Sequence, residues 1–209
     1  MIDQKLTEML EDTKSAKRAS AAKAIGKTAD DQYGPVLLAA LQTEFEDSRT
    51  WQAQSAMIRA LADIEYRDAL DYLWKVSKRE LEHTIVYGEL GFAIGRLTPI
   101  LNSDISVVRQ IVANGSVEFA RGAFRAIYFL RIVPEKAEDV AFLIGQARSD
   151  YENEGRVITK RCYLAAATAG WNGSEAERFL EECKSTEWKM LREIVELSRG
   201  KIYSQWKPW

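Results

Sequence analysis

A short alanine-rich phrase recurs five times along this chain and decides its fold. The copies are Ala21-Ala22-Lys23-Ala24-Ile25-Gly26, Met57-Ile58-Arg59-Ala60-Leu61-Ala62, Leu90-Gly91-Phe92-Ala93-Ile94-Gly95, Ala123-Phe124-Arg125-Ala126-Ile127-Tyr128 and Leu164-Ala165-Ala166-Ala167-Thr168-Ala169. Measured between Ala24, Ala60, Ala93, Ala126 and Ala167, the spacings are 36, 33, 33 and 41 residues. A repeat of this length is one pair of helices, and stacked pairs form an α-solenoid.

The rest of the chain fits the same architecture. Helical periodicity is nearly continuous, without sustained alternation or an Asn-Gly or Asp-Gly hairpin turn. We therefore expect an all-α, right-handed α-solenoid of about five antiparallel helix pairs, with N- and C-terminal capping helices. The expected single domain spans residues 1–209, with pairs at about 15–46, 48–79, 83–114, 116–149 and 154–184 and a C-terminal cap at 187–209.

Composition narrows the class of protein. Hydrophobic residues make up 46% of the chain and charged residues 29%, which is ordinary for a globular protein. The net charge of -2 argues against nucleic acid as the main partner. No apolar run is long enough to cross a bilayer and no signal peptide is visible, so we expect no membrane partner and a cytoplasmic location.

Catalytic and metal-binding signals are weak. His83 is the only histidine, and it falls at an expected helix start. One histidine and two cysteines, Cys162 and Cys183, are too few to supply the four ligands of a standard zinc site. We expect both cysteines to be buried and reduced. We expect no cofactor, no metal and no enzymatic activity.

Three glycines lie inside one expected helix. Gly88, Gly91 and Gly95 do not follow a strand, so they do not form a phosphate-binding loop. Each interior glycine costs about 1 kcal/mol relative to alanine. Close helix–helix approach or a kink explains them better than a ligand-binding bend.

Residues 18–41 resemble a known repeat. Arg18-Ala19-Ser20-Ala21-Ala22-Lys23-Ala24-Ile25-Gly26, followed by Tyr33-Gly34-Pro35-Val36-Leu37-Leu38-Ala39-Ala40-Leu41, is similar to HEAT-like repeats of the phycobilisome-lyase type. Later pairs match only in their first helix, and Tyr128 replaces the small residue found at Gly26 and Gly95. The resemblance implies the fold and leaves function open, because this repeat serves unrelated roles.

A partial basic register crosses the repeats. Lys23, Arg59 and Arg125 occupy one repeat position, and Arg18 and Arg161 share another. The resemblance extends to HEAT-like DNA glycosylases acting on alkylated bases, which grip phosphates with such a stripe. Phe92 and Ala166 interrupt the register here, so bonding to neighbouring turns is the favoured role of these cations.

The second helices supply the candidate partner-binding residues. In solenoids these helices usually line the concave face, and their outward positions here are mixed polar with one aromatic residue. This composition suits a protein interface better than a small-molecule pocket. The candidates are Gln42, Glu46, Asp71, Tyr72, Lys75, Arg109, Gln110, Glu138 and Asp139.

Tryptophan is abundant, with 6 residues in the chain. We expect Trp188 in the core and Trp51 at least half buried. Trp206 and Trp209 lie in an aromatic tail that either caps the array or docks a partner.

These features predict a non-catalytic protein-binding module, monomeric before it meets its partner. The chain resembles compact HEAT-like immunity proteins, which bind and block bacterial toxins. The alternatives are a HEAT-like DNA glycosylase and a generic assembly scaffold.

Overall fold

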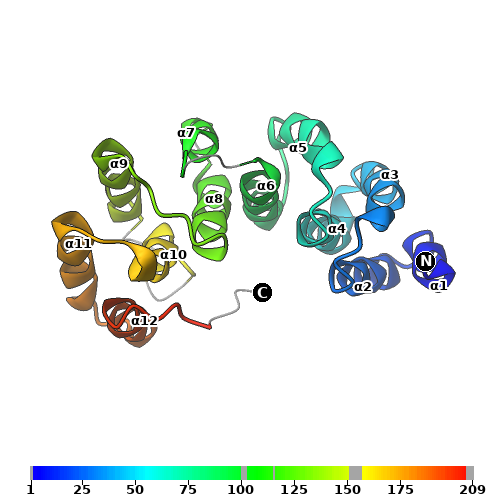
Figure 1. Ribbon diagram of the computed structural model, residues 1–209. Helices are drawn as coiled ribbons and strands as arrows, with labels where there is room; N and C mark the ends of the chain where they lie inside the picture. The colour runs from blue at the N-terminus through cyan, green and yellow to red at the C-terminus, as the bar shows by residue number, and fades with distance from the viewer. Residues whose placement is uncertain (1, 100–102, 115, 151–156, 206–209) are drawn as a thin grey trace. The chain divides into compact units, whose positions relative to one another are not determined.

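Every regular element that the structure describes is helical (Figure 1). The computed structural model describes residues 2–99, 103–114, 116–150 and 157–205. The chain divides into two compact units, residues 1–99 with 110–123 (unit 1) and residues 100–109 with 124–209 (unit 2). Neighbouring helices pack on one another as in a helical repeat solenoid, so the predicted all-α class is confirmed.

Unit 1 is built from two layers of helices. Helices α2, α4 and α6 lie side by side, while α3 packs on α4 and α5 packs on α6 (Figure 1). Helix α1 packs on α2, and the first turns of α8 also belong to this unit. The bounds are α1 Gln4–Leu10, α2 Ser15–Gly26, α3 Gly34–Glu44, α4 Trp51–Asp63, α5 Leu70–Ser77, α6 Thr84–Leu97 and α8 Val117–Phe129.

Turn chemistry sets where two of these elements begin. The Asp30 and Asp47 carboxylates accept hydrogen bonds from the backbone N–H groups of Gln32 and Arg49, both at 3.0 Å. Each therefore caps a short 3-10 turn that leads into the next helix. Pro35 stands in the first turn of α3, where a missing N–H costs little.

Small residues let the helices of the first layer approach closely. A Cβ atom added to Gly91 of α6 would lie 2.0 Å from the carbonyl oxygen of Phe119 in α8. A Cβ added to Gly122 of α8 would lie 2.1 Å from the Gly88 oxygen. A Cβ added to Gly26 of α2 would lie 3.2 Å from the Ala60 Cα atom of α4. The close approach predicted for the glycines of α6 is therefore confirmed at Gly91.

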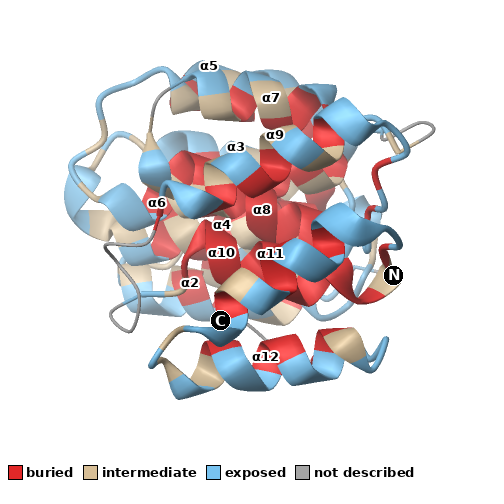
Figure 2. Ribbon diagram, turned by 90° about the vertical axis from the view of Figure 1, so that its left-hand side faces the viewer, coloured by how far each residue is buried: buried red, intermediate tan, exposed pale blue. Residues whose placement is uncertain are grey.

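Unit 2 surrounds a short central helix. All eight residues of α10 (Lys160–Ala167) are buried, and α9, α11 and α12 pack on it. Figure 2 shows buried residues on one side of α12 and exposed residues on the other. The remaining bounds are α7 Ser106–Ala113, α9 Ala137–Arg148, α11 Ser174–Lys184 and α12 Lys189–Arg199, and both α7 and α8 contribute residues to both units.

Three helices are each followed by a residue that has a left-handed backbone conformation and is not glycine. The residues Glu65, Arg131 and Lys201 have φ between 53° and 58°. The next backbone N–H then bonds back to the last turn of its helix, from Tyr66 to Leu61, from Ile132 to Ile127 and from Ile202 to Leu197. Glycine usually occupies this position, so the sequence held no stop signal for α4 or α8.

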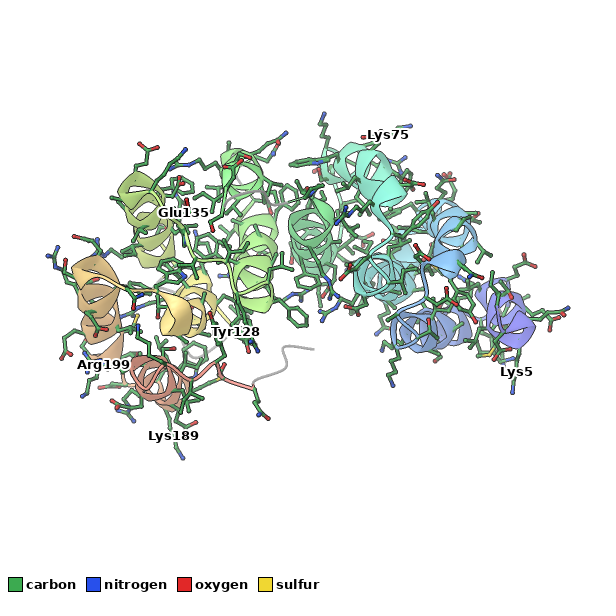
Figure 3. All side chains as sticks on the ribbon, in the orientation of Figure 1. Lys5, Lys75, Tyr128, Glu135, Lys189 and Arg199 are labelled. Carbon is green, nitrogen blue, oxygen red and sulfur yellow. The ribbon has the colours of Figure 1, made fainter. Side chains whose placement is uncertain are left out.

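The C-terminal segment folds back onto the end of α8. The Tyr128 hydroxyl donates a hydrogen bond to the Ser204 carbonyl oxygen at 2.5 Å (Figure 3). Leu191 and Val195 are fully buried on α12, as expected for a capping helix, but Trp188 is only partly buried at its start. The prediction that Trp188 lies in the core was wrong, because it precedes the first turn of α12.

The other expectations about tryptophan have mixed outcomes. Trp51 is partly buried, while Trp171 is 2% exposed and donates from its indole N–H to the Ile132 carbonyl oxygen at 2.8 Å. Trp206 and Trp209 lie outside the described residues.

Substituting Gly91 and Gly88 with alanine should have opposite effects. Gly91→Ala places a methyl group against the Phe119 backbone and should lower the free energy of unfolding by about 3 kcal/mol. Gly88→Ala meets only the Glu118 oxygen at 3.7 Å, so it should raise stability by about 1 kcal/mol through helix propensity. Urea denaturation followed by circular dichroism measures both, and equal effects of the two substitutions would contradict the close approach.

Candidate interaction surface

Five of the candidate residues lie in unit 1 on α3, on α5 and just after α3. Gln42, Glu46, Asp71 and Lys75 are exposed, and Tyr72 is partly buried. We call these five residues the α3–α5 polar surface. Lys75 extends away from α5 at the outer edge of the unit (Figure 3). Their exposure leaves hydrogen-bonding groups available for a partner.

An aromatic pair holds this surface together. The Phe45 ring meets the Tyr72 ring edge-on, with centroids 6.3 Å apart. Burial raises the pKa of the Tyr72 hydroxyl, nearby Arg79 lowers it, and Glu46 raises it. Tyr72 therefore stays protonated at neutral pH, and its hydroxyl can both donate and accept beside one cation and one anion.

A small pocket adjoins the same residues. Its volume is about 180 Å³, and Phe45, Arg79, His83 and Val86 are among its lining residues. The His83 ring stacks on Trp51 with centroids 5.4 Å apart, and His83 is the residue just before α6. His83 therefore lies at the start of a helix, as the sequence predicts. The pocket itself escaped the sequence analysis, because its residues come from four separate segments.

The candidate residues of unit 2 are held by contacts within the protein. The Arg109 guanidinium donates to one Asp139 carboxylate oxygen at 2.7 and 3.1 Å and to the Glu138 carbonyl oxygen at 3.3 Å. It also lies over the Phe142 ring, 4.1 Å from the centroid. Arg109 thus fastens α7 to α9.

Asp139 does not point outward as the sequence predicted. It is only 6% exposed, because its carboxylate turns toward Arg109. Glu138 is exposed beside it in unit 2, and Gln110 is exposed in unit 1. Whether any of the nine residues contacts a partner stays a prediction.

The basic register does not form an open stripe. Arg59 pairs with Asp63 at 3.2 Å and lies over the Phe92 ring at 4.4 Å, and Arg125 is only 6% exposed. Lys23 is exposed. Two of the three cations therefore face protein groups, as the favoured structural interpretation expects.

The second register is structural as well. Arg18 of α2 forms a bidentate pair with Glu44 of α3, at 2.6 and 2.7 Å. Arg161 of α10 is 1% exposed and donates to the Glu182 carbonyl oxygen at 2.6 Å and to the Cys183 sulfur at 3.3 Å. Both arginines therefore connect neighbouring helices.

Acidic side chains predominate around two larger cavities of unit 1. One, of about 830 Å³, is lined by Asp31, Asp63, Glu65 and Asp68 against Arg67 and Arg96. The other, of about 470 Å³, is lined by four acids and one cation, which are Glu11, Asp12, Glu44, Asp47 and Arg18. Such linings repel phosphate groups.

One of these acids is strongly perturbed at the protein surface. The Arg49 side chain and backbone N–H donate to Asp47 and lower its pKa to about 2. Asp47 therefore keeps its charge at any physiological pH, which adds to the negative field around the smaller cavity.

The described residues contain neither a candidate metal centre nor a candidate membrane span. No group of three or more His, Cys, Asp or Glu side chains in this part of the chain is placed to hold a metal ion. No helix of the described ranges is long and apolar enough to cross a membrane.

One known family matches part of the chain. Residues 17–43, which cover α2 and α3, are similar to the PBS lyase HEAT-like repeat. This supports the interpretation of the chain as a HEAT-like repeat protein, on the segment where the resemblance was read from sequence. No curated protein matches the chain.

The buried ion pair in this matched segment has a testable energetic role. Arg18→Leu leaves the Glu44 carboxylate, only 3% exposed, without its counterion. The free energy of unfolding should fall by about 3 kcal/mol. The control is Arg49→Leu, which removes an exposed ion pair with Asp47 and should cause no measurable change. Thermal and urea unfolding measure both, and equal effects would contradict a structural role for Arg18.

Proposed function

We propose that this protein is a non-catalytic inhibitor of the immunity type, which binds a bacterial toxin and blocks its active surface. The HEAT-like repeat indicates a protein-interaction or scaffold role. The observation that supports binding most directly is the α3–α5 polar surface, where exposed groups of both charges surround the Phe45–Tyr72 pair. Interfaces commonly place such polar groups around an aromatic anchor.

Several features of the chain belong to this proposal. The working species is a monomer before binding, and residues 1–209 act as one repeat domain. The proposed location is the cytoplasm, where the buried thiols of Cys162 and Cys183 stay reduced. A generic assembly scaffold would use the same surface, and the two roles differ in whether binding abolishes the partner's activity.

The glycosylase alternative has no support in the structure. A phosphate-gripping groove needs a continuous row of available cations. Here Arg59 is paired, Arg125 is buried, and two cavities of unit 1 have mainly acidic linings.

The proposal is tested by purifying the tagged protein from its native host and identifying what accompanies it. The expected result is one stoichiometric protein with toxic activity, encoded by a neighbouring gene, whose toxicity is neutralised by co-expression of this chain. Recovery of nucleic acid, or a bound protein whose activity is unchanged, would overturn the inhibitor role.

A charge exchange on α5 then locates the binding surface. The double substitution Asp71→Lys with Lys75→Glu keeps the net charge and reverses the field of the α3–α5 polar surface. Affinity for the purified partner should fall by about tenfold or more, measured by calorimetry. The matched control exchanges the exposed i,i+4 pair of α12, Lys189→Glu with Glu193→Lys, and should leave affinity unchanged. If only the control weakened binding, the surface would be assigned wrongly.

A further inference from the structure

The small pocket beside the α3–α5 polar surface is lined by a buried side chain with an unused hydrogen-bonding atom. Gln54 of α4 is 4% exposed and lines this pocket of about 180 Å³. Its Nε2 atom donates to the Glu44 and Asp47 carbonyl oxygens, at 3.1 and 3.0 Å. Both amide hydrogens are therefore used, and no group of the described residues donates to the Gln54 Oε1 atom. We call this cavity, which Phe45 and Val86 also line, the Gln54 pocket.

The partners of this amide fix which way round it lies. Both acceptors are backbone carbonyl oxygens, so turning the amide over would place its oxygen against two other oxygens. The same two carbonyl groups also accept from the Thr50 hydroxyl, at 3.2 and 2.8 Å. The Oε1 atom is therefore the hydrogen-bonding group that Gln54 can offer to an occupant of the pocket. An occupant that donates to it removes the cost of an unpaired buried acceptor.

One wall of the pocket is held in place and its sides are partly apolar. The Tyr87 hydroxyl donates to the Arg79 carbonyl oxygen at 2.7 Å and accepts from the Leu81 backbone N–H at 3.0 Å. These bonds fasten the loop between α5 and α6, which forms that wall. Phe45, Leu81 and Val86 supply the apolar side chains. A protein cavity of about 150 Å³ holds benzene, so this pocket has room for one planar side-chain group.

Acids outnumber cations in the lining of the Gln54 pocket. Glu80 and Glu82 are exposed, and neither forms an ion pair within the part of the chain that the structure describes. Arg79 is the one arginine or lysine among the described residues of the lining. Two carboxylates and the Gln54 Oε1 atom are thus available as acceptors. An occupant that matches them carries a positive charge and several hydrogen-bond donors.

We propose that the Gln54 pocket receives an arginine side chain of the protein partner. The guanidinium donates to the Gln54 Oε1 atom and to the carboxylates of Glu80 and Glu82, because its five N–H groups can serve several acceptors at once. Its plane stacks on the Phe45 ring, and its methylene stem packs on the apolar side of the pocket. This assignment rests on the proposed function, because the partner is taken to be a protein that meets the α3–α5 polar surface.

The test uses the full chain, short peptides and the His83 ring as a reporter. His83 lines the pocket and is the only histidine of the chain, so its ring gives a single set of NMR signals. Acetyl-Gly-Arg-Gly-amide at millimolar concentration should shift these signals in a saturable way. The same peptide with citrulline keeps the shape and loses the charge, and it should bind about tenfold more weakly.

Three outcomes of this titration would overturn the assignment. Unchanged His83 signals would show that the arginine peptide does not enter the pocket. Equal binding of the arginine and citrulline peptides would show that the charge of the occupant plays no part. Equally tight binding of a lysine peptide would show that any cation is accepted, without the stacking that a planar guanidinium provides.

Variants separate the pocket from a general attraction to acidic surfaces. Glu80→Gln with Glu82→Gln should weaken binding of the arginine peptide about tenfold, and Gln54→Met should weaken it about fivefold. The matched control is Asp31→Asn with Asp68→Asn, which removes the same charge from exposed residues at the larger acidic cavity. The control should change the affinity by less than about twofold. Circular dichroism checks that each variant is folded, and equal loss in the control would refute the assignment.

Arg79→Gln should have the opposite effect. It removes the cation of the lining, so the arginine peptide should bind about threefold more tightly. A variant that failed to fold could not produce this gain. Unchanged or weaker binding would contradict the charge match assigned to the pocket.

Calorimetry with the purified partner keeps this assignment apart from the proposed function. Glu80→Gln with Glu82→Gln should lower the affinity for the partner about tenfold, whereas Asp31→Asn with Asp68→Asn should not. If a toxin is neutralised but neither the pocket substitutions nor the arginine peptide has an effect, the pocket assignment alone falls. If the arginine peptide binds as described and no toxin is recovered, the proposed function alone falls.

Discussion

The backbone contact between α6 and α8 in unit 1 is the constraint on which the first helical layer depends. Where Gly91 faces the Phe119 carbonyl oxygen and Gly122 faces Gly88, no side chain fits between the two helices. Dispersion and burial must then come from the residues that flank the crossing, and Phe92, Ala93 and Phe119 are almost completely buried there. The small residues of the recurring alanine-rich phrase are buried in the same way, since Ala60, Ala126 and Ala167 are also at most 1% exposed.

Close packing of small residues explains why arginines form the longer connections. A guanidinium on a long side chain can reach an acid on a neighbouring helix, which alanine and glycine side chains cannot do. Arg18 reaches Glu44 and Arg96 reaches Asp63 in unit 1, while Arg148 reaches Glu182 in unit 2. Each pair specifies which helices meet, since an unpaired charge at a half-buried site is costly. Arginines used in this way are not available to hold phosphates, which agrees with the structural role that the sequence favoured for the basic register.

The sequence predicted what depends on local patterning. Helical class and the close approach at Gly91 follow from periodicity and residue size over a few turns. Asp139 was misplaced because its environment depends on a partner that sequence patterns do not reveal, since Arg109 lies 30 residues before it. The left-handed ends at Glu65 and Arg131 were also invisible, since they use ordinary residues where glycine is the usual signal.

Tyr128 departs from the repeated phrase and makes a contact that the other repeats do not make. Other copies of the phrase keep a small residue here, such as Gly26 and Gly95, and a Cβ added to Gly26 would lie 3.2 Å from the Ala60 Cα atom. The Tyr128 hydroxyl instead reaches the Ser204 carbonyl oxygen and ties down the chain after α12. One departure from the repeated phrase therefore accounts for the anchored segment after α12.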